Sequence, residues 1–185
     1  MELFSKSKPN NDLQLFLSEF PVWAAILSVK LVDELQTEDT TSRWPTILEN
    51  SLSRQKLIDC LIGANLFYLR LTPEGALASL LFGENFLEKV LPSLPDETKV
   101  YFAMAYQFYE KENQNGNVFT SLLENWYKIK IDPLDACAAF VIEQEISGSE
   151  EFTLLVGALL PTLNRLRVKQ LEWLKEITEK WSNLK

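Results

Sequence analysis

Tyr101-Phe102-Ala103-Met104-Ala105-Tyr106-Gln107-Phe108-Tyr109 is the stretch of this sequence that indicates its fold most directly. It places five aromatic residues in nine positions and contains no charge. At helical spacing it presents two neighbouring apolar faces, one formed by Tyr101, Met104, Ala105 and Phe108, the other by Phe102, Tyr106 and Tyr109. A helix that is apolar around much of its circumference is normally central and buried. The stretch therefore predicts a central helix and an α-helical fold.

Signals for helix starts and stops surround this stretch. Ser93 followed by Asp96 indicates its start, and the run Asn-Gln-Asn-Gly-Asn at 113–117 predicts a loop after it. Asp-Pro at 132–133 opens a further helix, because an Asp N-cap followed by proline is typical of a first turn. Ser-Gly-Ser at 147–149 predicts its end, and the acidic residues that follow favour the start of a last long helix.

The two ends of the chain also show helical periodicity. Residues 13–31 carry apolar side chains at steps of three and four, although Pro21 is expected to kink or split that helix. Pro161 is expected to bend or interrupt the last helix in the same way, which leaves residues 162–185 as a terminal amphipathic helix. Residues 1–10 are predicted to form an N-terminal tail.

The predicted fold is a single all-α domain over residues 1–185, an irregular bundle of about six or seven helices. The length suits one domain, and six glycines and eight prolines provide little material for a turn-rich β fold. Two short pieces, 67–71 and 127–131, alternate in the manner of strands. Pairing of these two pieces would add one minor two-stranded ribbon to the helices.

The residue types in the chain exclude several kinds of catalytic site. There is no histidine, so histidine-dependent triads, haem ligation and ordinary catalytic zinc sites are ruled out. Neither GxxxxGK[ST] nor GxGxxG occurs, so no phosphate-binding loop of these kinds is present. We expect no cofactor and no metal. Carboxylates remain, so an enzyme that uses only such groups stays as an alternative.

The charge and the cysteines bear on partners and location. A net charge of -8 disfavours nucleic acid, because binding phosphates requires clustered Lys and Arg. Cys60 and Cys137 lie in apolar surroundings and far apart in sequence, which suggests buried thiols in a reducing compartment. The longest apolar runs fall short of the ~20 residues that span a bilayer. We therefore expect a cytoplasmic protein without a transmembrane segment.

The terminal helix is the first candidate binding site. Residues 163–185 carry six basic residues against three acidic ones in an otherwise acidic chain. Trp and Arg are enriched in binding hot spots. The predicted partner-binding residues are Arg165, Arg167, Lys169, Trp173, Ile177 and Trp181. The alternatives are that this helix docks on its own bundle or makes weak contact with a membrane surface.

The aromatic helix offers a second candidate site, an apolar groove lined by Phe102, Tyr106 and Tyr109. The tyrosine hydroxyls there would serve as polar handles for a ligand or partner helix. The function predicted from these observations is a non-catalytic intracellular interaction module, such as an adaptor, an assembly factor or a regulatory subunit, that binds another protein or itself. A helical carrier of an apolar small molecule is the alternative, ahead of the carboxylate enzyme.

Overall fold

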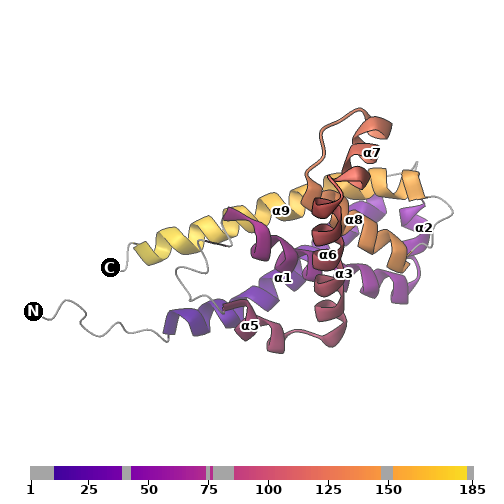
Figure 1. Ribbon diagram of the computed structural model, residues 1–185. Helices are drawn as coiled ribbons and strands as arrows, with labels where there is room; N and C mark the ends of the chain where they lie inside the picture. The colour runs from indigo at the N-terminus through magenta and orange to yellow at the C-terminus, as the bar shows by residue number, and fades with distance from the viewer. Residues whose placement is uncertain (1–10, 39–42, 74–75, 77–85, 147–151, 183–185) are drawn as a thin grey trace, which may run out of the picture.

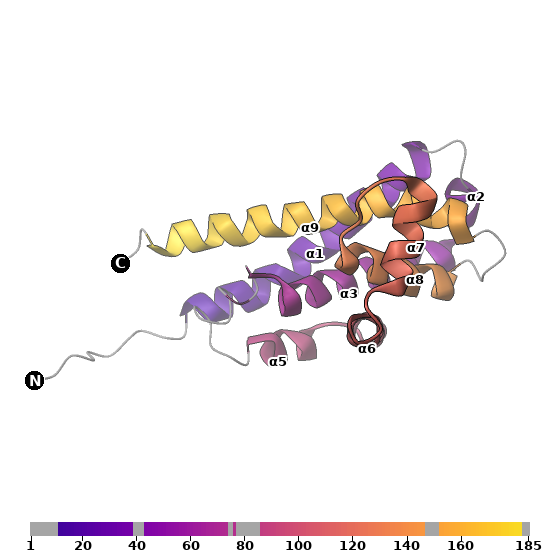
Figure 2. The same cartoon turned by 45° about the horizontal axis from the view of Figure 1, so that its top comes forward.

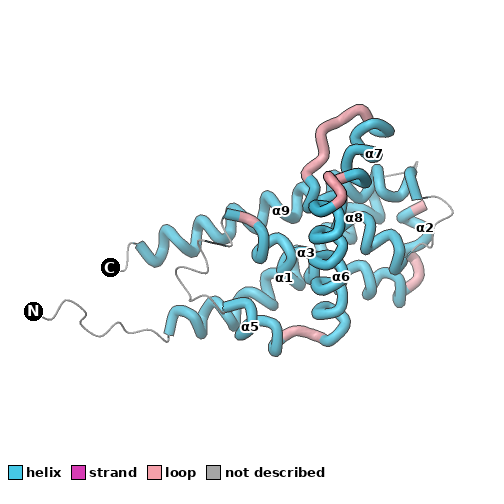
Figure 3. The backbone as a smooth tube through the Cα atoms, in the orientation of Figure 1, coloured by secondary structure: helices cyan, strands magenta, loops and turns pink. Residues whose placement is uncertain are grey.

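The computed structural model describes residues 11–38, 43–73, 76, 86–146 and 152–182. In these ranges all regular structure is helical (Figure 3), which confirms the prediction of an all-α irregular bundle. Six helices have ten residues or more: α1 (Asn11–Glu38), α3 (Ser51–Leu71), α6 (Asp96–Gln114), α7 (Val118–Tyr127), α8 (Pro133–Ile146) and α9 (Phe152–Ser182). The short elements are α2 (Trp44–Leu48), α5 (Phe86–Val90) and the 3-10 turn η1 (Leu91–Ser93).

The first and last helices form the long dimension of the molecule. α1 and α9 pack against each other and run in opposite directions, so that the start of α1 and the end of α9 lie at the same end (Figures 1 and 2). α6 crosses this pair steeply, and in Figure 2 it is seen almost end-on. α7 stands beyond the end of α6, beside α8 and the first turns of α9 (Figure 1).

The most deeply buried helix is α3 rather than α6. Every residue from Cys60 to Leu69 is buried, and this run contains no charged residue. α6 is a helix as predicted, but its buried positions are only Thr98, Tyr101, Ala105 and Glu112. The aromatic rings of α6 therefore pack on one side of the bundle, while α3 occupies its centre.

Gly63 allows α3 and α6 to approach closely. A Cβ atom at this position would lie 3.0 Å from the backbone of Thr98 and Phe102 and from the Cβ atom of Tyr101. Real Cβ atoms rarely come so near, so glycine is required here by space rather than by backbone conformation. Ala64, the next residue, continues the small surface on which α6 packs.

Two expectations from the sequence are corrected. The two-stranded ribbon was wrong: residues 67–71 belong to α3, and 128–131 form the loop after α7. The alternation of residue types in 67–71 does not indicate a strand, because Phe67, Tyr68 and Leu69 are all buried inside a helix. Pro21 and Pro161 also split neither helix, because each lies inside a continuous α-helix; the kink or bend expected at each proline stays a prediction.

Some predictions lie outside the described residues. They include the N-terminal tail at 1–10 and the Ser-Gly-Ser helix stop at 147–149. In the part of the chain that the structure describes, no helix has both the length and the apolar character needed to cross a membrane.

Candidate functional site

The arginines of the terminal helix are held in ion pairs within the molecule. Arg167 donates to both carboxylate oxygens of Asp135 on α8, at 3.0 and 2.9 Å, and lies 3.2 Å from Asp132. Arg165 lies 3.3 Å from the carboxylate of Glu34 on α1. These two side chains therefore join α9 to the helices around it.

The apolar residues of the terminal helix also pack inward. Trp173 stacks on Trp23 of α1, and Ile177 is buried. Lys169 is exposed and pairs with Glu172 one turn along its own helix, at 2.8 Å. The side chain of Trp181 lies outside the described residues. The structure thus brings α9 onto the body, and partner binding through these residues stays a prediction.

The three residues of the predicted groove are half-buried on α6. Phe102 and Tyr106 stack with their ring centroids 6.3 Å apart, and the guanidinium of Arg70 lies 6.0 Å from the Tyr106 centroid. Tyr109 instead meets Phe67 edge-on, at 5.7 Å. These rings fill the junction of α6 with the second half of α3, and the ligand groove stays a prediction.

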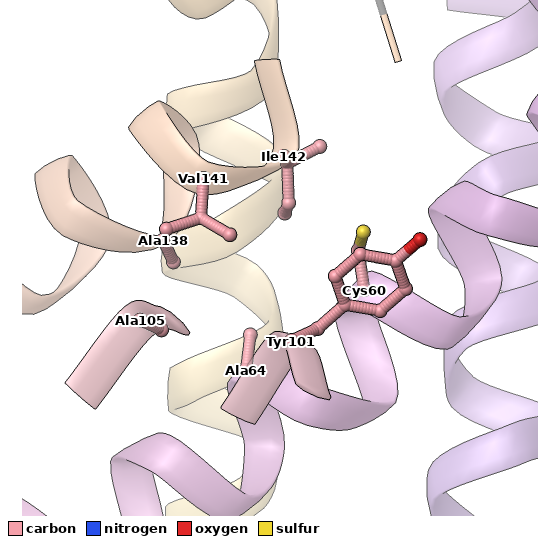
Figure 4. A pocket seen from close by; sticks show the side chains of 7 residues that line it. All are labelled: Cys60, Ala64, Tyr101, Ala105, Ala138, Val141 and Ile142. Atoms are coloured by element: carbon pink, nitrogen blue, oxygen red, sulfur yellow. The ribbon is translucent and has the colours of Figure 1, made fainter. Parts of the chain in front are cut away.

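A small cavity lies between α3, α6 and α8 (Figure 4). Its volume is about 10 Å³, enough for one water molecule at most. The ring of Tyr101 lies beside the Cys60 sulfur at its wall, and small side chains form most of the remainder (Figure 4). Burial raises the pKa of the Cys60 thiol well above its ordinary value, so this thiol is not a nucleophile at neutral pH. This cavity does not accommodate an apolar ligand.

α7 carries two apolar stripes, of which only one is used by the fold. The inner stripe, Phe119, Leu123 and Tyr127, faces the body. The outer stripe consists of Val118, Leu122 and Trp126, which are 62%, 41% and 47% exposed. Ile129, just beyond the helix, is also 54% exposed. We call these four residues the outer face of α7.

A cluster of aromatic rings joins the inner stripe of α7 to the helices around it. Phe119 meets Phe140 of α8 edge-on at 5.1 Å and Phe152 of α9 at 5.8 Å. Phe108 of α6 stacks on Phe140 at 4.1 Å and also contacts Phe119. Four helices therefore meet in this cluster, and offset or edge-on aromatic pairs of this kind add to the stabilisation from burial.

Polar contacts fix both ends of α7. At its start, the carboxylate of Glu112 on α6 accepts a hydrogen bond from the backbone N–H of Phe119 at 2.7 Å. At its end, the Tyr127 hydroxyl donates to the Thr153 carbonyl in the first turn of α9. The Tyr127 ring lies so close to Gly157 that a Cβ there would come within 2.8 Å of it. Contacts with α6, α8 and α9 therefore fix the position of the helix that carries the outer face.

A second set of exposed apolar residues lies on α1. Val22, Ile26 and Val29 are 59%, 66% and 38% exposed and follow each other at helical spacing. This stripe contains no aromatic ring. Aromatic residues dominate the energetics of protein interfaces, so the outer face of α7, with Trp126, is the stronger candidate.

Comparison with known proteins adds no assignment. No family model matches this chain. No curated protein and no solved structure matches it either. Among the described residues there is also no group of three or more acidic or cysteine side chains placed to hold a metal ion.

The signal for this surface is present in the sequence, although none of the predicted sites includes it. Val118, Leu122 and Trp126 recur at steps of four, and Phe119, Leu123 and Tyr127 repeat the same spacing one residue later. A ten-residue helix at the edge of a bundle buries only one of two such stripes. Which stripe turns outward depends on the position of the aromatic cluster, and that is a tertiary property.

Proposed function

We propose that this protein is a non-catalytic interaction module, an adaptor, assembly factor or regulatory subunit, that binds another protein through the outer face of α7. The observation that carries the proposal is the exposure of Val118, Leu122 and Trp126 along one stripe of an anchored helix, with exposed Ile129 shortly after its end. Exposed apolar patches on soluble domains mark interaction sites more often than scattered single residues do.

The form of the surface supports binding without large rearrangement. α7 is capped by Glu112, and Phe119 lies in the aromatic cluster, so the outer face has a defined orientation before a partner arrives. A preorganised surface avoids part of the entropy cost of association. Trp126 is the expected centre of the binding energy, because Trp is the residue most enriched among hot spots.

The test is site-specific photocrosslinking in the full chain, in its own cells. A photoreactive phenylalanine analogue replaces Leu122, and the matched control replaces Val100. Val100 is 54% exposed but lies in the first turns of α6, at the end away from α7 (Figure 1). We expect a discrete protein adduct from position 122 and none from position 100. Equal adducts from both positions would contradict the proposal.

A second measurement uses the purified crosslinked partner. Trp126→Ser should weaken its binding to the full chain by about tenfold or more, the range expected for a hot spot. Val100→Ser, which removes an exposed apolar residue elsewhere, should leave the affinity unchanged. If Trp126→Ser binds as well as the wild type while retaining its helicity, the outer face is not the interaction surface.

A further inference from the structure

The exposed charges at the end of α7 differ in sign from the net charge of the protein. Residues 113–131 contain two lysines and one glutamate, and the next residue, Asp132, pairs with Arg167 at 3.2 Å, whereas the chain has a net charge of -8. Lys128 is exposed, and the side chain of Lys130 is 95% exposed. Both lysines lie at the end of α7 that carries Trp126 and Ile129.

The one acidic residue of this segment is already engaged. Glu124 accepts a hydrogen bond from the backbone N–H of Ile131 at 3.1 Å and pairs with Lys130 at 3.3 Å. The Ile131 N–H lowers the pKa of Glu124, with a smaller contribution from Lys130. Beside the apolar stripe itself lie Ser121 and Asn125, which are exposed and uncharged. The surface therefore offers an apolar stripe with positive charge at one end.

The size of this surface limits the kind of partner. α7 has ten residues and is about 15 Å long, close to three turns of a partner helix. A stable dimer of globular proteins buries about 800 Å² on each side, from roughly 20–30 residues. Four apolar side chains on and just after one short helix do not reach that size, whereas one amphipathic helix needs only a few anchors at helical spacing.

A second copy of this chain is a poorer occupant. Its exposed stripe on α1 could meet α7 only in a heterologous contact, which does not close in a dimer. An isologous contact of α7 with α7 would bring no acidic partner to Lys128 or Lys130, because Glu124 is already engaged. Two bodies that each carry a net charge of -8 also repel one another.

We infer that the outer face of α7 receives an amphipathic helix of another protein, with acidic residues in its first turn beside Lys128 and Lys130. Acidic side chains are favoured in the first turn of a helix, because that end carries the positive end of the helix dipole. The partner helix therefore runs antiparallel to α7. This inference rests on the proposed function and adds the chemistry and direction of the partner.

The probes are stapled model helices of about four turns, since shorter or unconstrained helices are marginal in water. Each has the same leucine stripe, with three glutamates in the first turn of one and three lysines in the first turn of the other. Binding to the full chain is followed by fluorescence anisotropy. We expect the glutamate helix to bind about threefold more tightly, because Lys128 gains an exposed ion pair whereas Lys130 already shares its charge with Glu124. Non-specific attraction to an acidic protein would give the opposite order, and that order or equal affinities would overturn the inference.

Reversing the charges of Lys128 and Lys130 tests where on the protein the model helix binds. Lys128→Glu with Lys130→Glu should reverse the preference, so that the lysine helix becomes the tighter ligand. Because the second change removes the partner of Glu124, Lys128→Glu alone serves as a further variant and should abolish the preference. If both variants still bind the glutamate helix more tightly, the model helix does not bind beside these lysines, and the inference is overturned.

Two further outcomes separate this inference from the proposed function. If position 122 crosslinks to a partner but the chain shows no preference for the glutamate helix, the proposed function stands and the inference of an acidic partner helix is overturned. In sedimentation we expect a monomer; a dimer that Trp126→Ser abolishes would show that the occupant is a second copy, and it would overturn this inference.

Discussion

The indole rings of Trp23 and Trp173 stack with their centroids 4.8 Å apart, and this contact joins the first long helix to the last. Phe20 adds a third ring, 5.7 Å from Trp173. Leu174 and Ile177, on the same part of α9, are also buried. The terminal helix is consequently a structural part of the bundle, and substitutions in it affect stability first.

Trp173→Ala should lower the free energy of unfolding by about 2 kcal/mol, less than for a fully buried Trp because this side chain is only half-buried. Urea unfolding followed by circular dichroism gives the value. Val168→Ala, on the exposed side of the same helix, is the control and should change stability by less than about 0.5 kcal/mol. Equal effects of the two substitutions would show that the stacking contributes nothing.

Arg167→Ala should be more damaging, by about 3–5 kcal/mol, because it leaves the buried carboxylate of Asp135 without its cation. Burial raises the pKa of Asp135 even with Arg167 present, and loss of Arg167 raises it further. A raised carboxyl pKa gives stability that is lost as the pH rises through it, so the variant should lose least at acidic pH. Lys169→Ala, which removes an exposed charge, is the control in the same unfolding series.

Gly63→Ala should destabilise the protein by about 1–3 kcal/mol, the usual cost of overpacking. The added methyl would push α6 away from α3, and the gain in helix propensity of about 1 kcal/mol offsets only part of that cost. Thermal unfolding is the measurement. A variant as stable as the wild type would mean that the two backbones separate without loss of packing.

Cys137 should make the protein sensitive to alkali. Burial raises the pKa of its thiol from an ordinary 9.0 to about 12. The contribution of this group is complete below pH 9.0 and is lost as the pH rises towards about 12, at roughly 1.4 kcal/mol for each pH unit. Cys137→Ala should therefore show a shallower fall in unfolding free energy across this range. Parallel curves for the two proteins would rule out the thiol as the cause.

Lys128→Gly should stabilise the protein by about 0.5–1 kcal/mol, because Lys128 ends α7 in the left-handed conformation, with φ of 57°. Lys130→Gly is the matched control, since Lys130 has no positive φ and gains nothing from glycine. The difference in melting temperature between the two variants is the test. A loss of stability in both would indicate that the side chain of Lys128, rather than its backbone, matters at this position.

Part of the candidate site could have been read from the sequence. The two stripes of α7, at 118, 122 and 126 and at 119, 123 and 127, are visible there. Their assignment to an inner and an outer face was not, because it depends on Phe140 and Phe152, which come from other helices. Arg167 shows the reverse case: its residue type suggested binding, whereas its actual partners, Asp132 and Asp135, lie more than thirty residues away in the chain.

The sequence by itself determined the helical class and most helix boundaries, because capping residues, prolines and apolar spacing act over a few neighbouring residues. Pro133 begins a helix after Asp132, where local signals predicted it, and α6 begins at Asp96, three residues after the predicted cap Ser93. Only the tertiary structure decided which helix is central and which apolar faces stay exposed. Burial depends on contacts such as Gly63 with Tyr101 and Trp23 with Trp173, which form between segments distant in the sequence and leave no local pattern.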